Sequence, residues 1–158
     1  MLKEGQKAPD FKLQANTGET VSLSGLKGKR VVIYFYPKDD TPGCTVEACG
    51  FRDNIKKIEY KDAVVLGVSP DSVDSHNKFI DKFKLPFILL SDTDKELCKA
   101  YGVWGEKSFM GRKYLGVFRT TFIIGKDGAV EKIYEKVKPE GHHDEVLEFL
   151  SAKDHVQK

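Results

Sequence analysis

Apolar residues occur in short runs separated by polar turns along this chain. Arg30–Tyr36 and Ala63–Ser69 are almost continuously apolar, which is typical of strands buried on both faces. Between them, Cys44–Tyr60 carries apolar residues at the spacing of a helix. The pattern therefore predicts a buried strand, a helix and a second buried strand in succession.

Turn residues mark the boundaries of the remaining elements. Asn16–Glu19 and Gly125–Gly128 are hairpin signals. They predict two hairpins, Phe11–Ala15 with Thr20–Leu23 and Arg119–Ile124 with Ala129–Tyr134. The other predicted elements are a helix at Asp71–Lys84 capped by Asp71 or Ser72, a strand at Phe87–Leu90, a short helix at Lys95–Tyr101 and a last helix from Pro139 to about Lys153. Gly102–Val117 shows no clear period, and no element is assigned to it.

This order of elements defines a fold class. A hairpin, then βαβαβα, then ββα predicts a three-layer α/β domain with a mixed central sheet, flanking helices and an N-terminal hairpin. The chain has 158 residues, enough for one well-buried core. It shows no internal repeat, low-complexity segment or linker, so we expect a single domain spanning residues 1–158.

Composition and charge exclude several classes of partner. The 26 basic residues nearly balance the 24 acidic ones, and lysines alternate with acids, so no nucleic-acid partner is expected. No apolar run approaches the roughly 20 residues that span a bilayer. The first residues are polar and lack a signal-peptide core, so a cytoplasmic protein is expected. An odd count of 3 cysteines fits poorly with a secreted disulfide framework.

Two cysteines lie at the predicted start of a helix. Thr41 is a good N-cap and Pro42 suits the first helical position, so Cys44 becomes the third residue of the helix. There, free backbone N–H groups and the helix macrodipole stabilise an anion such as a thiolate.

The two thiols point in different directions. Cys44 shares the apolar stripe of Ala48, Phe51, Ile55 and Ile58. Cys49 is rotated from it by roughly 140° and faces solvent. In an intact helix their Cα atoms would lie roughly 8–9 Å apart, beyond the limit of about 7 Å for a disulfide. A permanent disulfide is therefore not expected. A reactive pair, a metal site and two core cysteines remain open.

The run PKDDTPGCTVEAC closely resembles the peroxiredoxins, and specifically the subfamily called bacterioferritin comigratory protein or peroxiredoxin Q. Pro37, Thr41 and Cys44 match the family pattern of Pro, three residues, Thr or Ser, two residues and Cys. VWGEKSFMG and RTTFIIGKDG resemble the same family, and the likeness runs from about Gly5 to Leu150. The resemblance implies a thioredoxin-like fold and a monomer. It also implies an antioxidant role, the reduction of hydrogen peroxide or alkyl hydroperoxides with electrons from thioredoxin or a similar dithiol, and no metal, haem or flavin.

The resemblance also implies roles for single residues. Cys44 would be the peroxidatic nucleophile, and Cys49 would resolve its sulfenic acid by forming a Cys44–Cys49 disulfide. Thr41 would direct its hydroxyl at the thiolate or the peroxide, and Arg119 would stabilise the thiolate and hold the peroxide oxygens. The supporting residues would be Pro37, which shields the pocket, and Glu47, which orients Arg119.

Each role has a structural alternative. Thr41 could be a plain N-cap, Arg119 and Glu47 could be surface residues, and Cys49 could be a bystander thiol. Cys98 is expected to be a packed helix cysteine, and His142-His143 a capping or surface pair.

Three rival functions use the same thiols. A dithiol oxidoreductase of the thioredoxin kind needs Cys-x-x-Cys, whereas here four residues separate Cys44 from Cys49. A peroxide-sensing binding protein would pass its oxidation to a partner, and catalytic turnover would distinguish it from a peroxidase. A zinc site on Cys44, Cys49 and a histidine is the third alternative.

Overall fold

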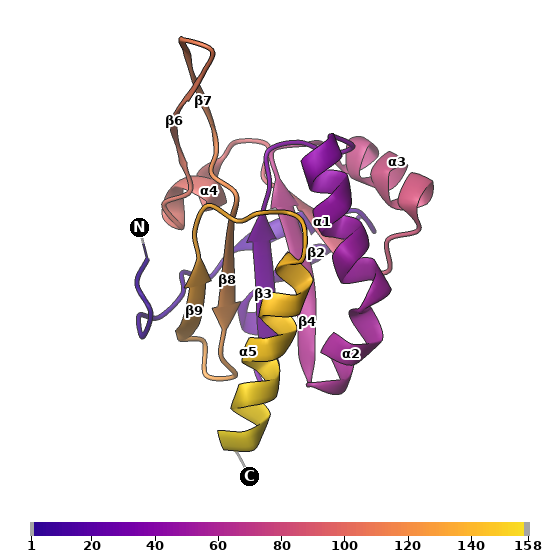
Figure 1. Ribbon diagram of the computed structural model, residues 1–158, viewed down its shortest axis with the longest axis vertical. Coiled ribbons are helices and arrows are strands. Elements are labelled where there is room, and N and C mark those ends of the chain that lie inside the picture. Colours follow the sequence, from indigo (N-terminus) through magenta and orange to yellow (C-terminus); the bar gives the residue numbers. More distant parts are fainter. Residues whose placement is uncertain (1, 157–158) are drawn as a thin grey trace.

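A seven-stranded sheet runs through the middle of the protein (Figure 1). The computed structural model describes residues 2–156. The strand order is β2-β1-β5-β4-β3-β8-β9, in which β3, β4 and β5 are parallel and the outer pairs are antiparallel. The strands are β1 (Lys12–Ala15), β2 (Thr20–Ser22), β3 (Arg30–Phe35), β4 (Ala63–Ser69), β5 (Ile88–Ser91), β8 (Thr120–Ile124) and β9 (Val130–Tyr134). The predicted mixed sheet and both predicted hairpins are therefore confirmed.

Helices lie on both faces of this sheet and supply its crossovers. They are α1 (Pro42–Asp53), α2 (Ile55–Tyr60), α3 (Val73–Phe83), α4 (Glu96–Ala100) and α5 (His142–Val156). The Ser72 hydroxyl caps α3 by accepting from the Ser75 N–H at 3.2 Å, as one of the two predicted caps. No helix within residues 2–156 is long and apolar enough to span a bilayer. The single domain over residues 1–158 stays a prediction, and its first and last residues lie outside the described range.

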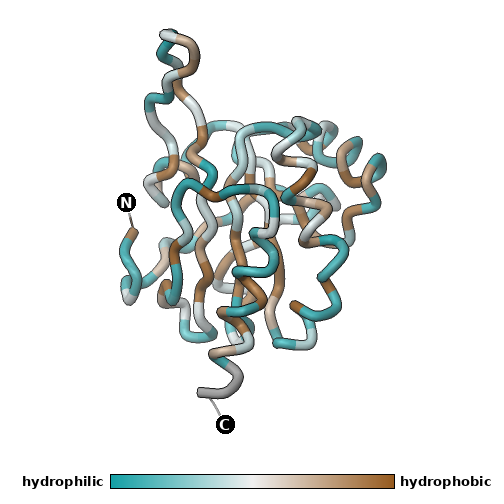
Figure 2. Tube along the Cα trace, in the orientation of Figure 1, coloured by the Kyte–Doolittle hydropathy of each residue, from teal (hydrophilic) through white to brown (hydrophobic). Residues whose placement is uncertain are grey.

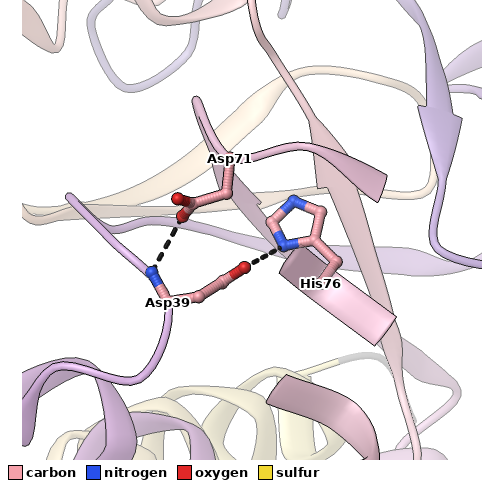
Figure 3. Close-up of side chains that lie close together, drawn as sticks. All are labelled: Asp39, Asp71 and His76. Atoms are coloured by element: carbon pink, nitrogen blue, oxygen red, sulfur yellow. Dashed lines mark hydrogen bonds and ion pairs between the residues drawn. The ribbon is translucent and has the colours of Figure 1, made fainter. Parts of the chain in front are cut away.

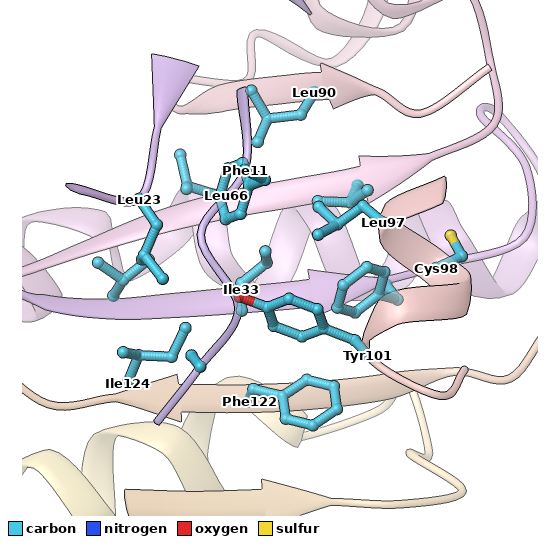
Figure 4. Close-up of a cluster of buried hydrophobic side chains, with 14 of the residues drawn as sticks. Phe11, Leu23, Ile33, Leu66, Leu90, Leu97, Cys98, Tyr101, Phe122 and Ile124 are labelled. Atoms are coloured by element: carbon cyan, nitrogen blue, oxygen red, sulfur yellow. The ribbon is translucent and has the colours of Figure 1, made fainter. Parts of the chain in front are cut away.

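Two apolar cores lie on opposite faces of the sheet. Alternate residues of β3 point to each face: Val31, Ile33 and Phe35 to one, Val32 and Tyr34 to the other. The first core contains Tyr101 beside α4 and Phe122 from β8 (Figure 4). The second lies under α1, α2, α3 and α5, and its members include Phe51, Ile58, Phe79 and Val146. Hydrophobic colouring accordingly gathers on the central strands (Figure 2).

The predicted helix from Cys44 to Tyr60 is divided in two. Asn54 ends α1, and its side-chain amide donates to the Gly50 carbonyl at 2.9 Å. That bond competes with the helical ladder, which explains why α2 begins as a separate helix at Ile55.

The segment without an assigned element is a hairpin that rises from one edge of the molecule (Figure 1). Strands β6 (Trp104–Phe109) and β7 (Arg112–Val117) pair antiparallel and join no other strand among residues 2–156. Their turn consists of Met110 and Gly111, both with positive φ. Most of its side chains are exposed, so the alternation that identifies a strand beside a core is missing.

Candidate active site

The start of α1 holds Cys44 where an anion is best stabilised. The chain leaves β3, passes through a loop at residues 36–41 and enters α1, in which Cys44 is the third residue. The first helical hydrogen bond runs from the Thr45 N–H to the Thr41 carbonyl at 2.8 Å, so the Gly43 and Cys44 N–H groups precede the ladder. The predicted helix start is confirmed.

Thr41 uses its side chain differently from a plain N-cap. The residue occupies the N-cap position, but its side chain makes no capping hydrogen bond. Its hydroxyl instead donates to the Lys38 carbonyl at 2.9 Å. Because the hydroxyl proton is engaged within the loop, the lone pairs of Oγ1 remain available to accept a hydrogen bond. The prediction of side-chain capping by Thr41 is therefore wrong.

A guanidinium lies directly against the Cys44 sulfur. Arg119 Nη2 is 3.3 Å from Cys44 Sγ, and Arg119 Nη1 donates to Glu47 Oε1 at 2.7 Å. Cys44 itself is only 1 % exposed. Gly43 leaves room for this approach, since a Cβ there would make a tight contact of 3.2 Å with Arg119 Nη2. The structure thus brings together Cys44, Arg119 and Glu47.

Arg119 is held in the wall of the site. It directly precedes β8, and its carbonyl accepts from the Val137 N–H at 3.1 Å. Burial lowers the pKa of Arg119, but the Cys44 sulfur and the Glu47 carboxylate outweigh that effect and raise it overall. With 18 % of its side chain exposed, Arg119 is not the surface residue of the structural alternative.

Glu47 is completely buried, so its alternative as a helix-surface acid is wrong. Its spacing of three residues from Cys44 puts both on one face of α1. Among the described residues, Glu47 Oε2 has no hydrogen-bond partner. Burial raises the pKa of Glu47 to about 7, although the adjacent Arg119 acts in the opposite direction.

The raised pKa of Glu47 predicts a specific pH dependence of stability. The folded protein binds an extra proton between the ordinary value of 4.5 and about 7. This contribution is complete below the ordinary value and is lost as pH rises through about 7. As pH rises through about 7, the unfolding free energy of the wild type should therefore fall by up to about 3 kcal/mol because of this group. Glu47→Gln should abolish this fall. Urea unfolding of the reduced protein near pH 5 and pH 8 measures it.

A matched control is Glu59→Gln, because Glu59 is exposed on α2. This variant should keep the wild-type pH dependence. Equal pH slopes for the wild type and Glu47→Gln would contradict the assignment of the raised pKa to Glu47.

Cys49 lies on a different face of α1 and is half-buried. All three cysteines are free thiols in this structure. The Asp53 carboxylate raises the pKa of Arg52 most, and the Cys49 sulfur adds to it, so Arg52 lies within electrostatic range of Cys49. Arg52 also ties α1 to the end of α3 by donating from Nη1 to the Phe83 carbonyl at 2.7 Å.

The start of α5 packs against the half of α1 that follows Cys49. His142 is fully buried, lies edge-on to Phe51 at 5.8 Å between ring centroids, and places Nε2 2.8 Å from Thr121 Oγ1. Burial lowers the pKa of His142. His143 lies against Gly50, where a Cβ would come within 2.4 Å of Nδ1. The prediction of a capping or surface pair is therefore wrong for His142.

Cys98 is a packed core residue, as expected. It is fully buried in α4, where its N–H donates to Asp92 Oδ2 at 2.8 Å. Burial and the nearby Asp92 raise the pKa of the Cys98 thiol strongly, which disfavours the reactive thiolate.

Two further features escaped the sequence analysis. Lys107 of β6 donates to the Val117 carbonyl at 2.9 Å, and its pKa is lowered by burial and by the neighbouring Arg119. Within the described residues, the one group that could hold a metal ion consists of Asp39, Asp71 and His76, so the structure does not gather Cys44, Cys49 and a histidine into a zinc site.

Pro37 is half-buried in the loop after β3, and its shielding role stays a prediction.

The fold and site together define a class: a thioredoxin-fold protein with a cysteine at a helix N-terminus beside an arginine. The AhpC/TSA family model matches residues 4–133. A putative peroxiredoxin bcp of Coxiella burnetii is 52% identical over 146 residues, covering 92% of this chain and 97% of that protein. Peroxiredoxin Bcp of Bacillus subtilis is 51% identical over 149 residues, covering 94% and 95%.

Solved structures agree with these relatives. The bacterioferritin comigratory protein of Xanthomonas campestris, studied for its alkyl peroxide reduction activity, gives a TM-score of 0.89 at 39% identity, covering 96% of this chain and 99% of that one. A cysteine-to-serine mutant of PrxQ from Xylella fastidiosa gives 0.93 at 36% identity, covering 98% of each chain. The chain therefore belongs to the AhpC/TSA family and, within it, to the peroxiredoxins of the bacterioferritin comigratory protein or peroxiredoxin Q kind. It is a thioredoxin-fold peroxidase.

Proposed function

We propose that this peroxiredoxin reduces hydrogen peroxide and alkyl hydroperoxides through Cys44, that Cys49 resolves the oxidised Cys44, and that thioredoxin or a similar dithiol protein restores both thiols. We also expect it to act as a cytoplasmic monomer without metal, haem or flavin. The observation that carries the proposal is the 3.3 Å contact between Arg119 Nη2 and Cys44 Sγ at the start of α1. The relative from X. campestris, with its alkyl peroxide reduction activity, supports the choice of substrates.

In the first step the Cys44 thiolate attacks one peroxide oxygen. A sulfur–oxygen bond forms and the O–O bond breaks, leaving a sulfenic acid on Cys44 and an alkoxide or hydroxide that takes a proton from water. Arg119 favours the thiolate and offers further N–H donors to the peroxide oxygens. Thr41 Oγ1, whose proton is engaged by Lys38, accepts the hydrogen bond of the peroxide O–H.

Glu47 keeps the guanidinium of Arg119 in place during this step. The Nη1–Oε1 bond of 2.7 Å fixes one branch of the guanidinium, which leaves Nη2 directed at the sulfur. Because both partners lie at the edge of the core, the pair is screened less by water than a surface ion pair would be.

In the second step the Cys49 sulfur attacks the sulfenic sulfur of Cys44. A disulfide forms and the sulfenic oxygen leaves as water. A dithiol reductant then attacks the disulfide, and its own two thiols become a disulfide in the exchange. The half-buried position of Cys49 supports this division of labour, because Cys44 is the more sheltered of the two.

Cys49→Ser should separate the two steps. The variant should still consume one equivalent of peroxide per chain, because Cys44 and Arg119 are unchanged, but it should fail to turn over with thioredoxin and thioredoxin reductase. Mass spectrometry should detect the sulfenic acid and, with excess peroxide, its conversion to sulfinic acid. The coupled assay, run with hydrogen peroxide and with an alkyl hydroperoxide, tests the reductant and the substrates together.

Cys98→Ser is the matched control, since Cys98 is buried in the core beneath α4. It should leave the thioredoxin-linked rate unchanged. If Cys49→Ser kept the wild-type rate and Cys98→Ser lost it, Cys98 would be the resolving residue instead.

A further inference from the structure

The buried carboxyl group of Asp39, in the loop before α1, lies beside the buried imidazole of His76 on α3 (Figure 3). Asp39 Oδ2 is 2.7 Å from His76 Nδ1 and accepts from the Ser75 hydroxyl at 2.8 Å. Asp39 Oδ1 accepts from the Tyr36 hydroxyl at 2.6 Å. His76 is fully buried and Asp39 is 7 % exposed. None of these groups takes part in the reaction steps above.

Both ring nitrogens of His76 have a hydrogen-bond partner. Its Nδ1 faces the Asp39 carboxylate, and its Nε2 is 3.0 Å from the Leu90 carbonyl of β5. A carbonyl oxygen only accepts hydrogen bonds, so Nε2 donates to Leu90, and Nδ1 shares a second hydrogen bond with the Asp39 carboxyl group. Asp39 and His76 are therefore a buried hydrogen-bonded pair, and removal of either partner leaves buried polar atoms of the other unsatisfied.

Asp39 is anchored through its main chain as well. Its N–H donates to Asp71 Oδ2 at 2.8 Å, and the Ser69 hydroxyl holds that same oxygen at 2.6 Å. The active-site loop is thus attached through one residue to the end of β4, to α3 and, by way of His76, to β5.

The residues beyond this anchor carry the chemistry. Asp40 has a φ of 58°, in the left-handed region that aspartate and asparagine adopt more readily than other non-glycine residues. The next residue is Thr41, whose hydroxyl is oriented by the Lys38 carbonyl on the other side of Asp39. The position of Thr41 Oγ1 therefore depends on how the main chain of the loop is held at Lys38 and Asp39.

From this geometry we propose that Asp39 and His76 are positioning residues of the peroxidase reaction. This hydrogen-bonded pair fixes the loop so that Thr41 Oγ1 and the Cys44 N–H meet the peroxide in the orientation that attack requires. Activation of the thiol itself is left to Arg119 and the helix N-terminus, which the pair does not contact. The inference rests on the proposed function, in which Cys44 is the nucleophile.

The proposal predicts a loss that is specific to peroxide. Asp39→Asn and His76→Gln should each lower the rate constant of the reduced protein with hydrogen peroxide about 10- to 100-fold, because small displacements of reacting groups have effects of this size. The rate and pH profile of Cys44 alkylation by iodoacetamide should stay within about twofold of the wild type, because alkylation needs only the thiolate. The double variant should be no slower than the slower single one, since both substitutions break the same contact.

The matched control is Asp40→Asn. Asp40 is the neighbouring loop residue, and its carboxylate pairs with Lys82 at 2.8 Å on the exposed surface. Asparagine tolerates the positive φ, so the loop should keep its shape. Both the peroxide rate and the alkylation rate should remain within about twofold of the wild type, as expected for a surface pair.

Several outcomes would overturn the proposal. Single variants with near wild-type peroxide rates would mean that the loop does not need the pair. The pair would have a purely structural role if the peroxide and alkylation rates fell together, or if the losses multiplied in the double variant. The same would follow if circular dichroism showed that both single variants had lost the folded state. If only Asp39→Asn fails to fold, His76→Gln decides alone. Peroxide consumption that persists in Cys44→Ser would instead refute the proposed function.

Discussion

Cys44→Ser should abolish peroxide reduction while the protein stays folded. A serine hydroxyl is not ionised near neutral pH, so the guanidinium of Arg119, 3.3 Å from the sulfur in the wild type, would have no thiolate to stabilise. We expect the rate to fall at least about 1000-fold, as is usual when a nucleophile is removed. The measurement is peroxide consumption by the reduced protein, with circular dichroism to establish the fold.

The change from sulfur to oxygen is small, so the variant should keep its fold and lost activity would report on the nucleophile itself. Cys98→Ser makes the same exchange at another buried position and should retain full activity. Turnover well above background in Cys44→Ser would show that the nucleophile has been misassigned.

Oxidation to the Cys44–Cys49 disulfide should unwind α1. Within an intact helix the two Cα atoms lie roughly 8–9 Å apart, whereas a disulfide needs less than about 7 Å. Unwinding must remove Phe51 from the core, where it is fully buried and stacks on Tyr34 at 4.9 Å between ring centroids. That loss costs about 1.5–3 kcal/mol, which the new covalent bond can offset.

Amide hydrogen exchange tests this expectation. Amides in residues 43–55 should exchange at least about 1000-fold faster in the disulfide form, because local opening would replace opening of the core. Trypsin should cleave after Arg52 in the disulfide form, since the hydrogen bond from the Arg52 side chain to the Phe83 carbonyl would be broken. The amides of β3 should be equally protected in both forms.

The Cys49→Ser protein oxidised to its sulfenic acid is the matched control, because it cannot form the disulfide and should keep α1 protected. Equal protection in the wild-type disulfide and reduced forms would mean that the helix does not unwind and that the proposed pairing is wrong.

Most of the sheet could be predicted because its central strands are buried on both faces. Arg30–Phe35 and Ala63–Ser69 match the apolar runs of the sequence almost residue for residue. The β6–β7 hairpin could not be predicted by the same signal, because only its base, at Trp104 and Val117, reaches the first core, and it turns through Met110 and Gly111. The turn has methionine where hairpins usually have asparagine or aspartate before glycine. Because methionine is uncommon at positive φ, the sequence shows no hairpin signal there.

The candidate site shows the same division between local and long-range information. The helix start with Cys44 is encoded locally by Thr41 and Pro42, and its position in the structure agrees. The spacing of three residues between Cys44 and Glu47 puts both side chains on the core-facing side of the helix. The charge of Glu47 nevertheless suggested a surface residue, whereas the structure buries it. The Asp39–His76 pair joins residues 37 apart in sequence, and no local pattern identifies such a contact.

Gly50 has a consequence for any attempt to engineer a more heat-resistant form of this peroxidase. A glycine inside a helix costs roughly 0.5–1 kcal/mol relative to alanine, so exchanging the two is a common route to thermostability. Here the added methyl group would approach within 2.4 Å of His143 Nδ1, so the exchange would displace the His143 ring from its place against α1. The close packing of His143 against α1 thus requires a glycine one residue after Cys49, where it lowers the stability of the helix. A thermostabilised variant would have to gain its stability elsewhere in the molecule.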